Sequence, residues 1–224
     1  GIALALALLG SVAGNEEDRP KARSLYVESI AIRKDLGDRS GVAALLHDLG
    51  GLAYEEGSTT ESQLLYEQAL TLARESGDKI LISSSLNALG KVAYEVRDYI
   101  SARSLFEQGL ALATELGDRW NVAYALSWLG NVSWRQGEKE AARSFYEKGL
   151  GIFGEFGDKW RFGYWFYRQG LWAFEEGNDA AASSLFRRSL EVWQYMLDKR
   201  SIALGLIGLG GASAKLGKAQ RGAR

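Results

Sequence analysis

The chain has 224 residues, of which 46% are hydrophobic and 25% charged, a composition typical of a folded globular protein and not of a disordered chain. It contains no cysteine and one histidine, which excludes disulfides, thiolate zinc sites, cysteine nucleophiles and histidine-rich metal clusters. Lys and Arg total 27 against 28 Asp and Glu. The chain as a whole therefore lacks the positive charge of a nucleic-acid or anionic-membrane binder.

The first ten residues are apolar and uncharged, as in the hydrophobic part of a signal peptide. No basic segment precedes them, and they fall in register with the repeat described next, so we interpret them as a buried helix. No other run approaches the roughly 18 to 20 apolar residues of a membrane-spanning helix. We therefore expect a soluble, cytoplasmic protein.

The sequence repeats with a 40-residue period, without insertion or deletion. Three columns of the repeat hold 14 of the 27 glycines: Gly10, Gly50, Gly90, Gly130, Gly170 and Gly210; Gly37, Gly77, Gly117 and Gly157; Gly57, Gly137, Gly177 and Gly217. A fixed period of roughly 20 to 50 residues is the signature of a solenoid, in which each unit buries its apolar face against its neighbours.

Each 40-residue unit is predicted to form two helices, which we call A and B. In the second unit, helix A places Val42, Leu46, Leu49 and Ala53 on one face and ends near Gly57. Helix B runs from Glu61 to Gly77, with Leu65, Tyr66, Ala69, Leu70 and Leu72 at helical spacing. The Gly-Asp pair between units suits a helix-to-helix turn, because Gly closes helix B and Asp caps the next helix A.

The whole chain is therefore predicted to be all-α, with eleven helices. We expect a single solenoid over residues 1–224, with units at 1–37, 38–77, 78–117, 118–157 and 158–197 and a terminal helix within 198–217. The first helix A lacks its own Gly-Asp turn, and the last unit stops where a helix B would begin. We interpret the chain as a fragment of a larger protein.

These repeats resemble the tetratricopeptide repeat, whose two helices carry W-x2-L-G-x2-Y and A-x3-F. Leu-Gly recurs at 9–10, 49–50, 89–90, 129–130 and 209–210, and the second motif recurs as Ala22 to Tyr26, Ala102 to Phe106, Ala142 to Tyr146 and Ala182 to Phe186. The unit is longer than the usual one of about 34 residues, the initial Trp is replaced and the closing Pro is missing. It is similar to the long-helix subclass of Pins/LGN scaffolds, kinesin light chains and MalT-like sensor domains, which implies a right-handed superhelix.

Two packing expectations follow from the columns. Glycines inside helix A, such as Gly50 and Gly90, are expected where a small residue of helix B comes close, since each costs roughly 1 kcal/mol relative to Ala. The basic residue after each turn Asp is expected to pair with the acid four residues earlier, as in Arg39 with Asp35 and Lys79 with Glu75.

Catalysis is not predicted. The only histidine, His47, has no nucleophile and acid arranged for a triad, and the Asp column is explained by helix capping. No phosphate-binding loop of the G-x-x-x-x-G-K-[ST] type occurs. We expect no enzyme activity, no cofactor and no metal site.

The architecture and the family resemblance favour a protein-interaction scaffold whose A helices bind a peptide or helix of a partner. The alternative is a sensor of a small-molecule effector within a bacterial signalling ATPase or transcriptional regulator. Nucleic-acid binding is disfavoured by the neutral charge. Exposed apolar residues predicted on the first and last helices indicate end-to-end self-association as a further interaction.

The resemblance implies that six positions of each helix A face the groove. Two units place polar residues there, including His47, Ser84, Asn87 and Lys91. The next two units place aromatic and basic residues there, which recognition surfaces favour. We predict that eight of these converge on one groove segment and bind the partner: Tyr124, Trp128, Asn131, Trp134, Arg135, Tyr164, Tyr167 and Arg168. The alternative is that the long side chains fill the interior, as expected for Trp160, Trp165 and Trp193.

Overall fold

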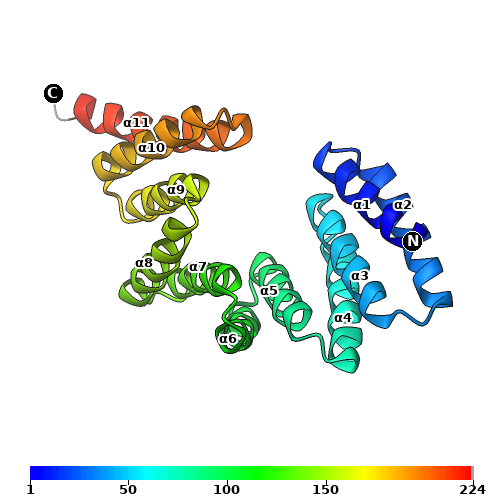
Figure 1. Ribbon diagram of the computed structural model, residues 1–224. Coiled ribbons are helices and arrows are strands. Elements are labelled where there is room, and N and C mark those ends of the chain that lie inside the picture. Colours follow the sequence, from blue (N-terminus) through cyan, green and yellow to red (C-terminus); the bar gives the residue numbers. More distant parts are fainter. Residues whose placement is uncertain (223–224) are drawn as a thin grey trace. The chain divides into compact units, whose positions relative to one another are not determined.

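The computed structural model describes residues 1–222, with side chains as far as residue 217, and these form eleven α-helices without a strand (Figure 1). The A helices are the odd-numbered ones: α1 (Ile2–Asn15), α3 (Arg39–Glu55), α5 (Lys79–Glu95), α7 (Arg119–Arg135), α9 (Lys159–Glu175) and α11 (Lys199–Gly222). The B helices are α2 (Arg19–Asp35), α4 (Thr59–Ser76), α6 (Tyr99–Leu116), α8 (Lys139–Glu155) and α10 (Asp179–Tyr195). The predicted all-α solenoid of eleven helices is confirmed.

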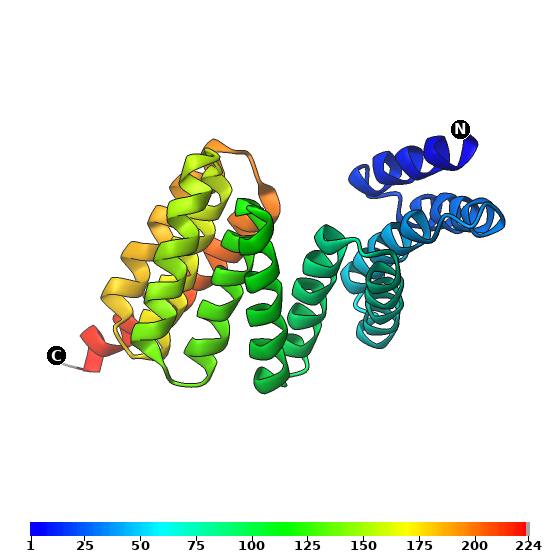
Figure 2. The same cartoon turned by 60° about the horizontal axis from the view of Figure 1, so that its bottom comes forward.

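The helices form two compact units, Gly1–Phe145 and Tyr146–Arg224, and the division falls within α8. Helices adjacent in sequence pack as antiparallel pairs, α1 with α2, α3 with α4 and α5 with α6 in the first unit, α9 with α10 in the second (Figure 2). A helices also contact the next A helix, as α3 contacts α5, α5 contacts α7 and α9 contacts α11. Within each unit, these consecutive A helices therefore lie side by side and together form one surface.

The turns between B and A helices follow the prediction. Gly37, Gly77 and Gly117 adopt φ values of 68° to 69°, in the left-handed region that a side chain disfavours. The following Asp caps the next helix: Asp38 Oδ1 accepts a hydrogen bond from the Gly41 backbone N–H at 2.9 Å. The same cap recurs at Asp78, Asp118, Asp158 and Asp198.

The glycine inside helix A makes room for an aromatic ring of its own helix B. A Cβ at Gly50 would lie 2.8 Å from the Tyr66 ring, and one at Gly90 would lie 2.9 Å from Phe106. The expected small residue is also close, because Ser62 Oγ donates to the Gly50 carbonyl at 2.9 Å. The prediction was therefore incomplete, since the ring four residues further along takes up the space. Tyr66 is 7% exposed and Phe106 is fully buried.

The predicted ion pairs across the Gly-Asp turn are wrong for Arg39 and Lys79. Arg39 Nη1 lies 3.2 Å from Glu75 Oε2, and Lys79 Nζ lies 2.6 Å from Glu115 Oε1, so each cation pairs with the acid 36 residues ahead. The turn interrupts the helix, which removes the geometry that brings residues four apart together. Lys159 continues the column, with Nζ 4.7 Å from the centroid of the Tyr195 ring. Each of these contacts therefore joins helix A to helix B of the same repeat.

The part of the chain that the structure describes has neither a membrane-spanning helix nor a cluster of metal-binding side chains. None of its helices combines the length and the apolar composition needed to cross a bilayer. Nor do three or more of its Asp, Glu or His side chains gather where they could bind a metal ion.

Candidate functional site

A pocket of about 230 Å³ lies on the A-helix surface of the first unit. Helices α3, α5 and α7 supply most of its lining, and α4 adds one ring. The lining residues are His47, Tyr66, Ser84, Asn87, Ala88, Lys91, Trp120, Asn121 and Tyr124. We call this the amide pocket, because two asparagines form its polar side.

The two asparagines are joined to each other and to the start of α7. Asn87, only 2% exposed, donates Nδ2 to Asn121 Oδ1 at 3.4 Å. Asn121 in turn donates Nδ2 to Asp118 Oδ2 at 2.7 Å and to Ser84 Oγ at 3.4 Å. Both contacts of 3.4 Å are long for hydrogen bonds. The hydrogen bonds that join Asn87, Asn121 and Ser84 beside the pocket are therefore weak.

A glycine on the neighbouring B helix lets Asn87 sit this deeply. A Cβ at Gly109 of α6 would lie 2.5 Å from Asn87 Oδ1. This oxygen is buried and accepts no hydrogen bond from any described residue. A buried amide oxygen without a hydrogen-bond donor lowers the free energy of unfolding.

Aromatic rings follow one another along α7, and two of them, Trp120 and Tyr124, line the pocket. Trp120 stacks on Tyr124 with ring centroids 5.4 Å apart and an interplanar angle of 16°. Tyr124 contacts Trp128 at 6.3 Å, and Trp128 stacks on Phe106 at 5.7 Å. Trp120 is 44% exposed, so part of its ring meets solvent. These contacts connect the exposed Trp120 ring to the buried Phe106 through Tyr124 and Trp128.

His47 lies at the inner edge of the pocket in a largely desolvated position. Its Nδ1 is 3.3 Å from Ser85 Oγ, and its ring centroid is 5.1 Å from that of Tyr66. Burial lowers the pKa of His47 to about 4, because the charged imidazolium loses its hydration. The imidazole is therefore neutral at physiological pH and can both donate and accept a hydrogen bond.

Charged groups border the pocket where α3 and α5 end. Lys91 Nζ lies 3.7 Å from the centroid of the Tyr54 ring. Tyr54 donates its hydroxyl to Glu95 Oε1 at 2.9 Å, and burial, followed by the Glu95 charge, raises the pKa of Tyr54. One repeat later, Arg135 Nε donates to the Tyr94 hydroxyl at 3.3 Å. An aromatic residue of one A helix thus meets a charged residue of the next.

The eight predicted site residues divide between the two units. In the first unit, Tyr124 and Trp128 are half-buried, Asn131 and Trp134 are 2% and 7% exposed, and Arg135 is exposed. Tyr124 lines the amide pocket and contacts Trp128. Lys139 Nζ lies 5.4 Å from the Trp134 ring centroid.

The second unit holds the other three predicted residues. Tyr164 stacks on Trp160 at 5.4 Å and contacts Tyr167 at 6.4 Å, and both tyrosines are half-buried. Tyr167 also packs on Phe186 and Trp193, and Arg168 is 9% exposed. Convergence of all eight residues on one groove segment stays a prediction. Of the tryptophans expected in the interior, Trp165 and Trp193 are buried and Trp160 is half-buried.

The eight residues omit most of the amide pocket. His47, Ser84, Asn87 and Lys91 occupy predicted groove positions, but the sequence prediction favours the aromatic units over these modestly polar ones. Trp120 and Asn121 lie at the first turn of α7, before the groove positions begin. The signal that marks Asn87 is the glycine at position 109, since a buried amide needs a neighbour without a side chain.

The comparison with family models matches residues 1–75 and 81–155 to the tetratricopeptide repeat. The chain belongs to the tetratricopeptide repeat family. The comparison with curated proteins gives no match. The 40-residue units described above are therefore long tetratricopeptide repeats.

Solved structures share this fold at low sequence identity. BtubC (BKLC) from P. vanneervenii is 19% identical, with a TM-score of 0.68 over 88% of this chain and 84% of that one. A Rap protein complexed with competence and sporulation factor is 15% identical, with a TM-score of 0.69 over 96% of this chain and 65% of that one.

A signal transduction ATPase with numerous domains, which carries a tetratricopeptide repeat sensor, comes from Pyrococcus horikoshii. It is 14% identical, with a TM-score of 0.74 over 92% of this chain. The chain spans 32% of the length of that ATPase. These likenesses show the fold.

Proposed function

We propose that this protein is an interaction scaffold that binds a peptide or helix of a partner protein on its A-helix surface. The observation that carries the proposal is the amide pocket, which is lined by two asparagines and by a stacked Trp120 that is 44% exposed. Side-chain amides can donate to a peptide carbonyl and accept from a peptide N–H, and Trp supplies rigid contact area. The proposal is also in keeping with the similar fold of the Rap protein solved in complex with competence and sporulation factor.

The size of the pocket favours a side chain over a whole small molecule. Its volume of about 230 Å³ is below the roughly 300 to 1,000 Å³ of pockets that enclose small ligands. One partner side chain would occupy the pocket while the partner backbone runs over Asn87 and Asn121. Lys91 at the border would favour an acidic group on that segment.

We extend the proposal to the eight residues predicted from sequence. Tyr124, Trp128, Tyr164 and Tyr167 would contact the partner, since all four are half-buried and keep solvent-facing atoms. Asn131, Trp134 and Arg168 would shape the surface beneath them, because each is at most 9% exposed. We propose no catalytic role for any of these residues.

Selection of peptides from a phage-displayed dodecapeptide library tests this function. The affinity of the selected peptides is then measured by fluorescence anisotropy for the wild type and for Trp120→Ala and Asn121→Ala. We expect each variant to weaken binding about tenfold or more. Tyr195→Ala is the matched control, because Tyr195 is 76% exposed on a B helix of the other unit. Unchanged affinity in both pocket variants, with an unchanged melting curve, would contradict the proposal.

A second candidate function is a sensor for a small-molecule effector within a signalling ATPase or regulator. It is favoured by the likeness to the sensor-bearing ATPase, of which this chain would correspond to one part. Such a protein would bind a metabolite instead of a peptide. Failure of the peptide selection, together with stabilisation of the chain by a metabolite mixture in a thermal-shift assay, would favour this candidate.

We further propose self-association through the two terminal helices. On α1, Ile2, Leu8 and Leu9 are 72%, 59% and 55% exposed, and on α11, Leu206 and Ile207 are 53% and 73% exposed. Exposed apolar residues grouped on one helix are typical of interaction surfaces. Sedimentation at micromolar concentration is expected to show oligomers that Ile2→Ser with Leu9→Ser dissociates. A monomeric wild type would overturn this expectation.

A further inference from the structure

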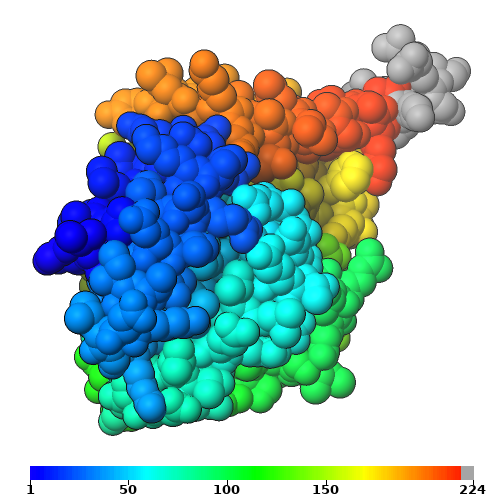
Figure 3. Space-filling view, turned by 90° about the vertical axis from the view of Figure 1, so that its right-hand side faces the viewer, coloured from blue at the N-terminus to red at the C-terminus, as the bar shows by residue number. Residues whose placement is uncertain are grey.

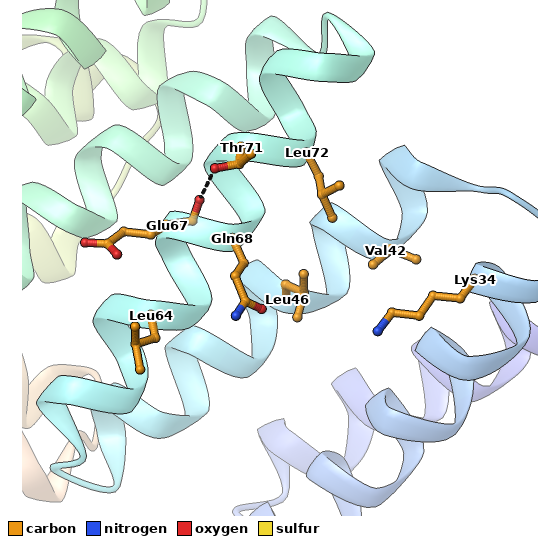
Figure 4. Close-up of a pocket in the computed structure, with 8 residues that line it drawn as sticks. All are labelled: Lys34, Val42, Leu46, Leu64, Glu67, Gln68, Thr71 and Leu72. Atoms are coloured by element: carbon orange, nitrogen blue, oxygen red, sulfur yellow. Dashed lines mark hydrogen bonds between the residues drawn. The ribbon is translucent and has the colours of Figure 1, made fainter.

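The first unit carries a second depression that shares no residue with the amide pocket. It has a volume of about 410 Å³ and lies over α3, between α2 and α4. Figure 3 shows the face on which the blue surface of the first helices meets the cyan surface of α4. The lining residues are Lys34, Val42, Leu46, Leu64, Glu67, Gln68, Thr71 and Leu72 (Figure 4). We call it the B-helix groove.

The groove has an apolar floor and walls. Val42 is 4% exposed, and Leu46 and Leu72 are half-buried against the core of the first repeats. Leu64 stands on the wall and is 54% exposed. Thr71 directs its hydroxyl back to the Glu67 carbonyl at 2.9 Å, a bond within α4. The hydroxyl of this wall is thus turned to its own helix, which leaves apolar surface facing the groove.

Comparison between repeats shows that Leu64 departs from its column. The equivalent positions in the other four B helices are all serine: Ser24, Ser104, Ser144 and Ser184. All four serines are exposed, so the position faces solvent in every repeat. Helix folding thus does not need a leucine here. The exposed Leu64 therefore adds apolar surface to this groove that the other repeats lack at the same position.

The charges of the groove differ at its two sides. Lys34, near the end of α2, extends toward α3 (Figure 4) and makes no ion pair with any described residue. Its basic neighbours are occupied, since Arg33 contacts Asp38 and Arg39 contacts Glu75. Glu67 lies on the α4 side and accepts from Gln63 Nε2 at 2.9 Å. An acidic group would therefore be attracted to the Lys34 side and repelled from the Glu67 side.

We propose that the B-helix groove binds a peptide segment of a partner protein that carries a large aliphatic or aromatic side chain and a nearby carboxylate. The apolar side chain lies against Leu46, Leu64 and Leu72, and the carboxylate pairs with Lys34. This interaction is independent of the amide pocket. The scaffold thereby holds two segments at once, one on each surface.

The chain offers a substitution that removes the groove contact without disturbing the fold. Leu64→Ser introduces the residue that the other four repeats carry at this position. Val27→Ser is the matched control, because Val27 is 55% exposed on α2 and does not line the groove. Lys34→Glu reverses the charge that selects the carboxylate.

A dodecapeptide phage library is selected on the wild type after depletion on Leu64→Ser. We expect acidic peptides with a large apolar residue, whose affinity in anisotropy measurements falls at least about tenfold in Leu64→Ser and about three- to tenfold in Lys34→Glu. Val27→Ser and Trp120→Ala leave the affinity unchanged, and peptides of the amide pocket do not compete.

Three results would overturn the inference: no peptide survives depletion, Val27→Ser weakens binding as much as Leu64→Ser does, or Lys34→Glu has no effect. Loss of binding in Trp120→Ala would assign the peptides to the amide pocket and would equally count against the groove. The proposed function fails separately, through its own variants Trp120→Ala and Asn121→Ala.

Discussion

Helices α7 and α9 carry the same Trp-x3-Tyr pair one repeat apart, and in both the two rings stack at 5.4 Å. In α7, Trp120 is 44% exposed at the edge of the amide pocket. In α9, the Trp160 indole donates to Asp198 Oδ2 at 2.8 Å and to Ser201 Oγ at 3.1 Å. One pair presents a ring beside a pocket, and the other fastens α9 to α11.

The two ring pairs also differ in the residue that follows the tryptophan, Asn121 in α7 and Arg161 in α9. Asn121 joins Asn87 and Ser84 and makes the pocket polar. Arg161 instead places its guanidinium 5.3 Å from the Trp160 ring centroid and 4.7 Å from that of Phe153. The same aromatic pair therefore borders a pocket beside small amides and packs within the fold beside an arginine. The residues next to the Trp-x3-Tyr pair therefore determine whether it borders a pocket or packs within the fold.

The largest effect is expected at Trp193 of α10. Trp193 is fully buried, packs on Tyr167 at 5.7 Å and fills the space left by Gly163. Trp193→Ala is expected to lower the free energy of unfolding by about 3 to 5 kcal/mol, measured by urea denaturation. Trp120→Ala should lower it by less than about 1 kcal/mol. Equal losses would show that Trp120 is a packing residue and would remove the contrast.

The next prediction concerns acid, and it separates the units because His47 of the first unit is the only histidine. The folded pKa of about 4 lies below the ordinary value of 6.5, so the unfolded chain binds a proton on His47 before the folded chain does. The free energy of unfolding should therefore fall as pH drops from 6.5 to 4, by at most about 3 kcal/mol.

His47→Gln should remove this contribution, as measured by urea denaturation at several pH values. The neighbouring Asp48 acts in the opposite direction: although part of its side chain meets solvent, the surrounding protein desolvates the carboxyl and raises its pKa to about 6. Asp48 is present in both proteins, so the difference between them isolates His47. Parallel pH profiles would contradict the burial of a neutral imidazole.

A smaller change in stability is expected from removing the indole N–H of Trp160, compared with that of Trp120. Trp160→Phe keeps the stacked ring but removes the donor to Asp198 and Ser201, which should cost about 1 to 2 kcal/mol. Trp120→Phe should change the free energy of unfolding by less than about 0.5 kcal/mol. Thermal melting followed by circular dichroism compares the two. A reversed order would mean that the Trp160 hydrogen bonds do not stabilise the second unit.

The smallest effects are expected from the ion pairs that join helix A to helix B within a repeat. Both pairs are exposed, with Arg39 at 70% and Lys79 at 55% side-chain exposure. Arg39→Ala and Lys79→Ala should each lower the free energy of unfolding by less than about 1 kcal/mol, and by less still at high salt. A loss above about 2 kcal/mol in either variant would exceed what an exposed ion pair contributes and would give these contacts a larger structural role.

The 40-residue period was sufficient to predict the helices, their caps and the order of packing, because each depends on local residue type. The sequence pattern gives Arg39 and Lys79 the wrong partners, because the acid that each contacts lies near the end of helix B and comes close only when helices A and B of one repeat pack antiparallel. Composition points to the aromatic residues of the predicted site. It does not point to Asn87, because the burial of Asn87 depends on Gly109 in another helix.

The central claim is that the amide pocket binds a peptide, and the single histidine reports on it directly. In a proton–carbon NMR spectrum the His47 Cε1–H gives one imidazole signal, since the chain has no other histidine. Addition of a saturating peptide selected on the wild type is expected to shift this signal, and Trp120→Ala should abolish the shift at the same peptide concentration. A His47 signal that stays in place while anisotropy shows the peptide bound would contradict the account.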